Sequence, residues 1–105
     1  MAIPISAMLP DANKILALEL PNLATELLKY LAQDQESLNR HNFGFKETVK
    51  DYPKELQLPV MRAFMEAWAY LEKEVLIAQK PSMETTMEFY FITRKGIKAL
   101  AKNPQ

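Results

Sequence analysis

The side chains best suited to chemistry in this sequence are few and lie far apart. His41 is the only histidine and cysteine is absent, which is a poor ligand set for a zinc site. Ser6, Ser37 and Ser82 lack the GxSxG turn that exposes a nucleophilic serine. No GxxxxGK(S/T) or GxGxxG loop is present to cradle a nucleotide. We therefore expect no enzyme activity, no metal and no small-molecule cofactor.

The charged side chains offer a different chemistry, ionic contact with a polyanion. Lys plus Arg and Asp plus Glu each number 13, so the net charge is zero, but the two signs segregate along the chain. The ranges 40–54 and 80–105 have an excess of basic residues, whereas 1–39 and 55–79 have an excess of acidic ones. A polyanion such as DNA would meet two local basic zones. Solvated surface charge is the alternative explanation of such zones.

Length and composition indicate one globular domain. The chain has 105 residues, of which 49% are hydrophobic and 25% charged, which is ordinary for a folded domain of this size. No apolar run approaches the roughly 18 residues of a membrane helix. The N-terminal stretch has no basic residues before its apolar segment, unlike a signal peptide. We expect a cytoplasmic protein that does not associate with membranes.

Proline divides the N-terminal third into short elements. Pro4 and Pro10 limit the first ten residues to an extended arm or a single helical turn. Asp11 is a plausible N-cap for a helix over 12–20, and a second helix starts near Pro21 and fades after residue 33. We assign residues 1–21 to an N-terminal arm and helix, and 22–105 to the main domain. The apolar surface of 1–20 exceeds what one short helix can bury, which predicts a homodimer through this segment.

Two further helices are predicted in the middle of the chain. Residues 45–52 suit a short helix that Pro53 ends, and 58–75 suit a long helix with Pro59 in its first turn. Trp68 lies at the centre of the apolar stripe of the long helix and is expected in the core. The opposite, outward face of this helix is formed by Arg62, Glu66, Ala69 and Lys73.

The hydrophobic period changes after residue 75. Two short runs of strand-forming residues, 76–79 and 87–93, flank the turn-like segment 80–86 and predict a β-hairpin. Thr93 is a plausible N-cap for a last helix over 94–102. On that helix Ile97, Leu100 and Ala101 are expected to face inward. The opposite sector is basic, and the sequence does not assign it a role; it contains Arg94, Lys95, Lys98 and Lys102.

The order of these elements resembles the winged helix-turn-helix superfamily over residues 22–102. Leu71 and Leu76–Ile77 are similar to the leucine-rich run that leads from a recognition helix into the first strand of the wing. The segment from Thr93 to Gly96 is similar to the turn that follows the second strand. The resemblance implies an α+β, mostly helical fold with a C-terminal β-hairpin wing and, in this chain, an extra N-terminal arm and helix.

The resemblance also implies DNA binding in a transcriptional or regulatory role. The helix over 58–75 would enter the major groove, and neighbouring lysines would lie near phosphates of double-stranded DNA. By position, the nucleic-acid-binding residues would be Lys46, Lys50, Lys54, Arg62, Glu66 and Lys73. The alternative is a protein-interaction adaptor without DNA contact, favoured by the zero net charge and by the mixed signs on the outward face.

Overall fold

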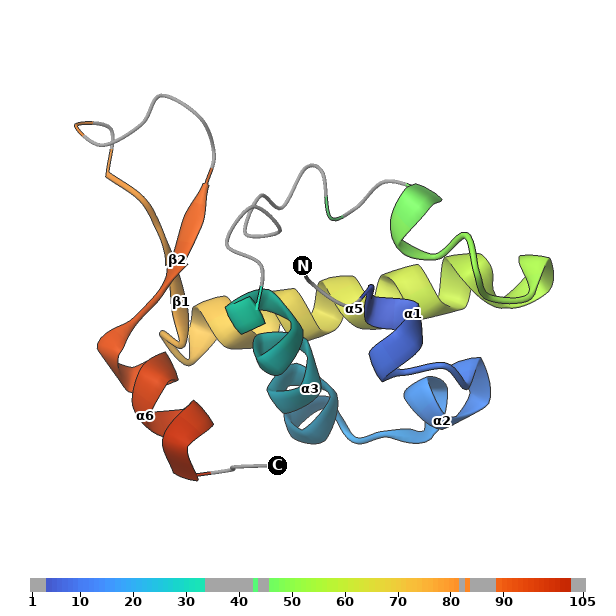
Figure 1. The fold of residues 1–105 in the computed structure, drawn as a ribbon, viewed down its shortest axis with the longest axis horizontal. Helices are drawn as coiled ribbons and strands as arrows, with labels where there is room; N and C mark the ends of the chain where they lie inside the picture. Colours follow the sequence, from blue (N-terminus) through green and yellow to red (C-terminus); the bar gives the residue numbers. More distant parts are fainter. Residues whose placement is uncertain (1–3, 34–42, 44–45, 82, 84–88, 103–105) are drawn as a thin grey trace.

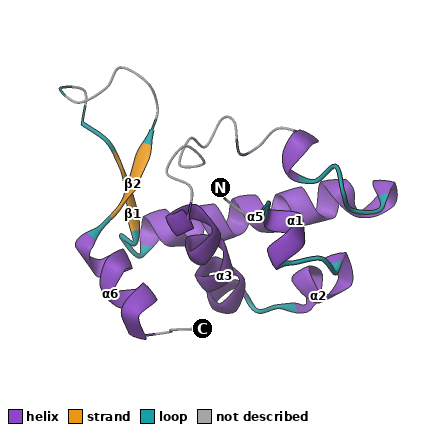
Figure 2. Ribbon diagram, in the orientation of Figure 1, coloured by secondary structure: helices purple, strands orange, loops and turns teal. Residues whose placement is uncertain are grey.

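The computed structural model describes residues 4–33, 43, 46–81, 83 and 89–102, which are mostly helical (Figure 1; Figure 2). The predicted α+β class is confirmed, as is the position of an antiparallel hairpin after the long helix. The elements are α1 (Ile5–Met8), α2 (Ala12–Ala17), α3 (Leu20–Gln33), η2 (Lys46–Thr48), α5 (Lys54–Lys73), β1 (Ile77–Gln79), β2 (Tyr90–Ile92) and α6 (Arg94–Lys102).

Helix α2 begins where predicted but ends early. The Asp11 carboxylate accepts hydrogen bonds from two backbone N–H groups of the first turn, at 2.9 and 3.4 Å, which confirms it as the N-cap. The helix predicted over 12–20 ends at Ala17 instead. A longer helix would press the ring of Pro21 against the carbonyl of Ala17 and leave that carbonyl without an N–H donor. Pro21 lies in the first turn of α3, where its missing N–H costs little.

Helix α5 starts earlier than the helix predicted over 58–75. It begins at Lys54, because Pro53 has extended backbone angles and its carbonyl accepts a hydrogen bond from the first turn. Glu55 in that turn suits the positive end of the helix. Pro59 therefore lies inside the helix rather than in its first turn, and its missing N–H removes one backbone hydrogen bond.

The end of α5 is closed by a left-handed residue that is not glycine. Val75 has a φ of 59°, which costs an L-residue roughly 1–2 kcal/mol and is rare for a β-branched side chain. Its N–H bonds to the carbonyl of Glu72 (3.1 Å), and the N–H of Leu76 bonds to that of Leu71 (2.8 Å). This is the Schellman arrangement, and it ends the helix at Lys73, two residues earlier than predicted.

Thr93 joins the hairpin to α6 and caps the helix as predicted. Its Oγ1 accepts the N–H of Gly96 (3.0 Å) and donates to the carbonyl of Val75 (2.5 Å). The N–H of Thr93 bonds to the carbonyl of Leu76 (3.0 Å). A β-carbon on Gly96 would clash with that same carbonyl oxygen. Glycine at this position therefore allows α6 to pack directly against the chain entering β1.

Within the described residues, both strands are shorter than the predicted runs 76–79 and 87–93, and residues 87–88 of the second run lie outside the described residues. Ile77 lies opposite Ile92, and Gln79 lies opposite Tyr90, in an antiparallel register. Ile77 and Tyr90 are buried, so the base of the hairpin is part of the core. Most of the predicted loop, residues 82 and 84–86, lies outside the described residues.

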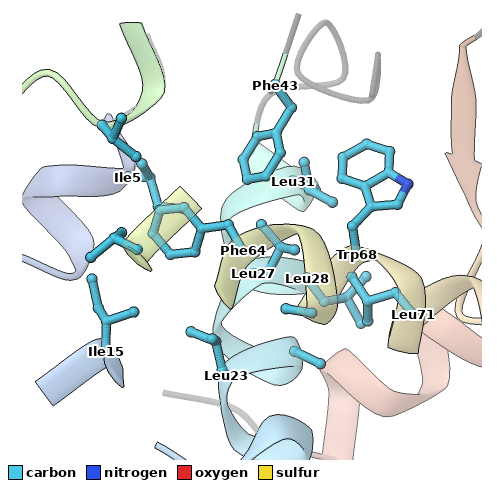
Figure 3. Packing of buried hydrophobic residues seen from close by; sticks show 14 of the residues in the cluster. Ile5, Ile15, Leu23, Leu27, Leu28, Leu31, Phe43, Phe64, Trp68 and Leu71 are labelled. Carbon is cyan, nitrogen blue, oxygen red and sulfur yellow. The ribbon is translucent and has the colours of Figure 1, made fainter. Parts of the chain in front are cut away.

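The core lies between α3 and α5 (Figure 3). Four buried leucines of α3 belong to one core cluster with Phe64 and Trp68 of α5. Trp68 is only 1% exposed, which confirms it as a core residue. Its ring lies 5.4 Å from that of Phe43 and 5.3 Å, edge-on, from that of Tyr90. Ile15 of α2 belongs to the same cluster, so part of the apolar surface of 1–20 is covered within the chain.

The short helix predicted over 45–52 is a single 3₁₀ turn, η2. Val49 and Tyr52 are buried as predicted, whereas Phe45 lies outside the described residues. The Tyr52 hydroxyl donates to the carbonyl of Leu9 (2.7 Å) and so ties this turn to the N-terminal segment. Burial, with a smaller contribution from the Asp51 carboxylate, raises the pKa of Tyr52 to about 12.

Candidate nucleic-acid interface

One face of α5 is uncovered along most of the helix. Arg62, Glu66, Ala69 and Lys73 are exposed as predicted, because the buried side chains of α5 fall in the opposite sector. Arg62 and Lys73 lie about 16 Å apart along the helix axis at 1.5 Å per residue. These four residues, here called the outward face of α5, form a stripe that a partner could contact over three turns.

The outward face of α5 is mixed in sign, but its arginine is not neutralised by an ion pair. Spacing would allow Arg62 to pair with Glu66 at i, i+4. Within the part of the chain that the structure describes, the ion pairs are Lys29–Glu26, Lys50–Glu47 and Lys95–Glu74, and none includes Arg62. The guanidinium of Arg62 is therefore available for a ligand that offers paired acceptors.

The three predicted lysines before and at the start of α5 are exposed but not equivalent. Lys50 Nζ lies 3.1 Å from the Glu47 carboxylate, and this hydrogen bond and charge raise the pKa of Lys50. A phosphate would have to compete with Glu47 for this lysine. Lys46 and Lys54 have no such pair among the described residues and are better placed for phosphate contact.

The predicted site residues are spread over η2 and the length of α5 rather than gathered in a cluster. Lys54 and Lys73 lie at opposite ends of α5, about 28 Å apart along its axis. Lys46 belongs to η2, which lies near the start of α5 (Figure 1). Such an arrangement suits an extended polyanion better than a small anion.

The structure corrects the predicted orientation of α6. Ile97 is 58% exposed and Ala101 is also exposed, although both were expected to face inward. Gly96 is buried instead, and Ala99 and Leu100 are half-buried against the core cluster. The close approach of Gly96 to β1 sets this rotation, which leaves the basic residues of the helix on its outer side. These are Arg94, Lys95, Lys98 and Lys102.

A second exposed surface is apolar and lies at the junction of α2 and α3. Leu16, Leu18 and Leu20 are 40%, 37% and 38% exposed. They line a cavity of 210 Å³ together with Pro59, Ala63 and Glu66 of α5. The apolar surface predicted for residues 1–20 is thus divided, with one part in the core and this part facing solvent. We call it the α2–α3 apolar patch.

Most of the other candidates for chemistry fall outside the part of the chain that the structure describes. These are His41, Ser37 and Ser82. Ser6 donates to a carboxylate oxygen of Asp51 (2.7 Å). Among the described residues, no group of three potential metal ligands converges, and no helix is long and apolar enough to cross a membrane.

Comparisons of the chain with protein-family models, with curated proteins and with solved structures found no match. The proposals below therefore depend on the sequence and on the geometry of the described residues.

Proposed function

We propose that this protein is a winged-helix DNA-binding protein with a transcriptional or regulatory role, and that α5 is its recognition helix. The observation that carries the proposal is the outward face of α5. It belongs to a long helix, is solvent-exposed, and presents an Arg62 that forms no ion pair with the other described residues. A helix of this width fits the major groove of B-DNA, and arginine is the commonest reader of guanine there.

The elements around α5 support the same assignment. The hairpin of β1 and β2 follows α5 directly, in the order that the winged-helix family uses. Lys46 and Lys54, near the N-terminal end of α5, are exposed and would contact phosphates, whereas Lys50 would contribute less because Glu47 already pairs with it. In this geometry Arg62 contacts a base, and Glu66 either accepts from a cytosine amine or repels the backbone.

Binding to duplex DNA is expected to fall steeply with salt. Four to six phosphate contacts would give a log–log slope of roughly −4 to −5, because each neutralised phosphate releases a counterion. Titrating a short mixed-sequence duplex into the full chain at low and at moderate salt measures this slope. Absence of binding at low salt, where electrostatic attraction is greatest, would remove the DNA proposal.

Substitutions on α5 separate base contacts from phosphate contacts in the same titration. Arg62→Ala should reduce the preference of the protein for one duplex sequence over another. Lys46→Ala should instead lower the affinity for all duplex sequences alike and reduce the slope of the salt dependence by about one. Lys14→Ala, on α2, is the control for a lost exposed charge. If Arg62→Ala and Lys14→Ala behave identically, α5 is not the reading helix.

A protein-interaction adaptor is the second candidate function, and the α2–α3 apolar patch is the observation that favours it. Leu16, Leu18 and Leu20 lie beside a cavity and are exposed, whereas the leucines of the core are buried. Contiguous apolar surface of this kind marks protein interfaces. The same patch is the surface through which we propose homodimerisation.

Dimerisation through this patch has a direct test. Light scattering at micromolar concentration should give twice the 12.1 kDa of one chain, and Leu16→Ser with Leu20→Ser should give the monomer. Leu58→Ser is the matched control, since Leu58 is 59% exposed but lies on α5. A wild-type monomer would contradict the dimer. If that monomer also fails to bind duplex DNA, the adaptor becomes the better assignment.

A further inference from the structure

The strongest concentration of positive charge in the described residues is on α6, not on the proposed recognition helix. Helix α6 has four basic side chains and no acidic one, whereas α5 has three of each. All four basic residues of α6 are exposed. Only Lys95 belongs to an ion pair among the described residues, at 3.9 Å from Glu74. Non-specific affinity for nucleic acid comes mainly from such cations.

We propose that α6 is a second DNA-contacting element, which holds backbone phosphates of the duplex that α5 approaches. This inference rests on the proposed function. Lys98 and Lys102 lie one turn apart on the same side of the helix, with Arg94 one turn before them. Helix α6 is about 13 Å long, and one strand presents a phosphate every 3.4 Å of duplex axis, so the stripe spans about four phosphates.

The junction between α5 and α6 fixes the basic stripe relative to the outward face of α5. Lys95 Nζ donates to the carbonyl of Glu74 (2.8 Å), the residue that follows Lys73. The Thr93 hydroxyl donates to the carbonyl of Val75 (2.5 Å). Gly96 packs against the carbonyl of Leu76. The start of α6 is therefore held beside the end of α5 (Figure 1).

The apolar residues of α6 favour a nucleic acid over a lipid surface as the partner. A membrane-surface helix inserts a broad apolar face between lipids. On α6, Gly96 is buried, and Ala99 and Leu100 are half-buried against the domain, so they are not available for insertion. Ile97 is the large apolar side chain of the helix that remains mostly exposed. One exposed isoleucine is not a broad apolar face, so the cations of α6 match a phosphodiester backbone better than a lipid surface.

The test compares two double variants with the same net charge. Lys98→Gln with Lys102→Gln removes two cations from α6, and Lys14→Gln with Lys29→Gln removes two from α2 and α3. The α6 variant should reduce the salt slope for a mixed-sequence duplex by about two and weaken binding on the order of 50-fold at about 0.1 M salt. The control variant should change the slope by less than about half a unit. Circular dichroism of each variant checks that the fold is kept.

The outcomes separate this inference from the function on which it rests. If the wild-type chain binds the duplex and the α6 variant keeps its slope, α6 is not a DNA contact, although the proposed function stands. If the wild-type chain does not bind at low salt, both proposals fall. A third arm uses vesicles of phosphatidylcholine and phosphatidylserine. Loss of vesicle binding in the α6 variant, with duplex binding unchanged, would assign the basic stripe to a membrane and overturn the inference.

Discussion

Replacing Trp68 with alanine is expected to lower the free energy of unfolding by about 3–5 kcal/mol. The side chain is 1% exposed and lies between the rings of Phe43 and Tyr90, so the change leaves a large cavity where several elements meet. A domain of this size has a total stability of about 5–15 kcal/mol, and the variant would be close to unfolding. Urea denaturation followed by far-ultraviolet circular dichroism measures the difference.

Two further variants identify the cause of the loss. Leu58→Ala removes a large side chain from the exposed side of the same helix, where 59% of it faces solvent, and should cost less than about 0.5 kcal/mol. Trp68→Phe should cost less than Trp68→Ala, because it keeps an aromatic ring. It also removes the indole N–H, which is buried without a hydrogen-bond partner among the described residues. A loss below about 1 kcal/mol for Trp68→Ala would place this side chain outside the core.

Gly96→Ala is expected to destabilise the protein by about 2–3 kcal/mol. In an ordinary helix the same change adds about 1 kcal/mol of stability, because glycine is a poor helix former. Here the new β-carbon would clash with the carbonyl oxygen of Leu76 and lie 2.8 Å from Cγ2 of Ile92. Helix α6 would have to move away from the hairpin, which also strains the hydrogen bonds of Thr93.

The decisive result is whether Gly96→Ala lowers or raises the free energy of unfolding. Thermal or urea unfolding of Gly96→Ala can be compared with Ile97→Ala, which alters the next residue of the same helix, where 58% of the side chain is exposed. The Ile97 variant should be within about 0.5 kcal/mol of the wild type. A stabilised Gly96 variant would show that α6 does not approach β1 as closely as the structure indicates.

The part of the candidate site that lies on a long helix could be predicted from the sequence. Helix α5 has many turns, so the sector of its buried residues is well defined, and Arg62, Glu66 and Lys73 were correctly expected on the exposed side. The start of the helix was predicted at Leu58 rather than Lys54, because a proline at position 59 suits a first turn. The positional preference of proline for the first turn of a helix did not reveal that Pro59 lies inside this one.

The ion pairs of the charged residues at the site were harder to predict than the positions of those residues on the helices. Lys50 lies just after η2 and pairs with Glu47, the middle residue of that 3₁₀ turn. A spacing of three residues permits this ion pair in an α-helix or a 3₁₀ turn, and only the structure shows that it forms. Conversely, Arg62 and Glu66 have the spacing of an ion pair and do not form one among the described residues, since exposed side chains gain little from pairing in water.

The sequence by itself determined the features that depend on neighbouring residues. Asp11 and Thr93 cap their helices because a side-chain oxygen next to a helix start reaches its free N–H groups. The hairpin followed from the change of period after residue 75, and Trp68 followed from its central position in the apolar stripe. Each of these signals lies within a short stretch of chain, so local stereochemistry is enough to interpret it.

The tertiary structure alone decided how α6 is rotated and where its charges point. Helix α6 has only nine residues, so its sequence does not determine which side faces the core. A side centred on Ile97 and Leu100 fits the pattern as well as one centred on Gly96 and Leu100. The choice between them depends on the contact of Gly96 with the carbonyl of Leu76, a residue twenty positions earlier in the chain. Steric exclusion between segments so far apart leaves no pattern in the local sequence, and it is what directs the basic stripe outward.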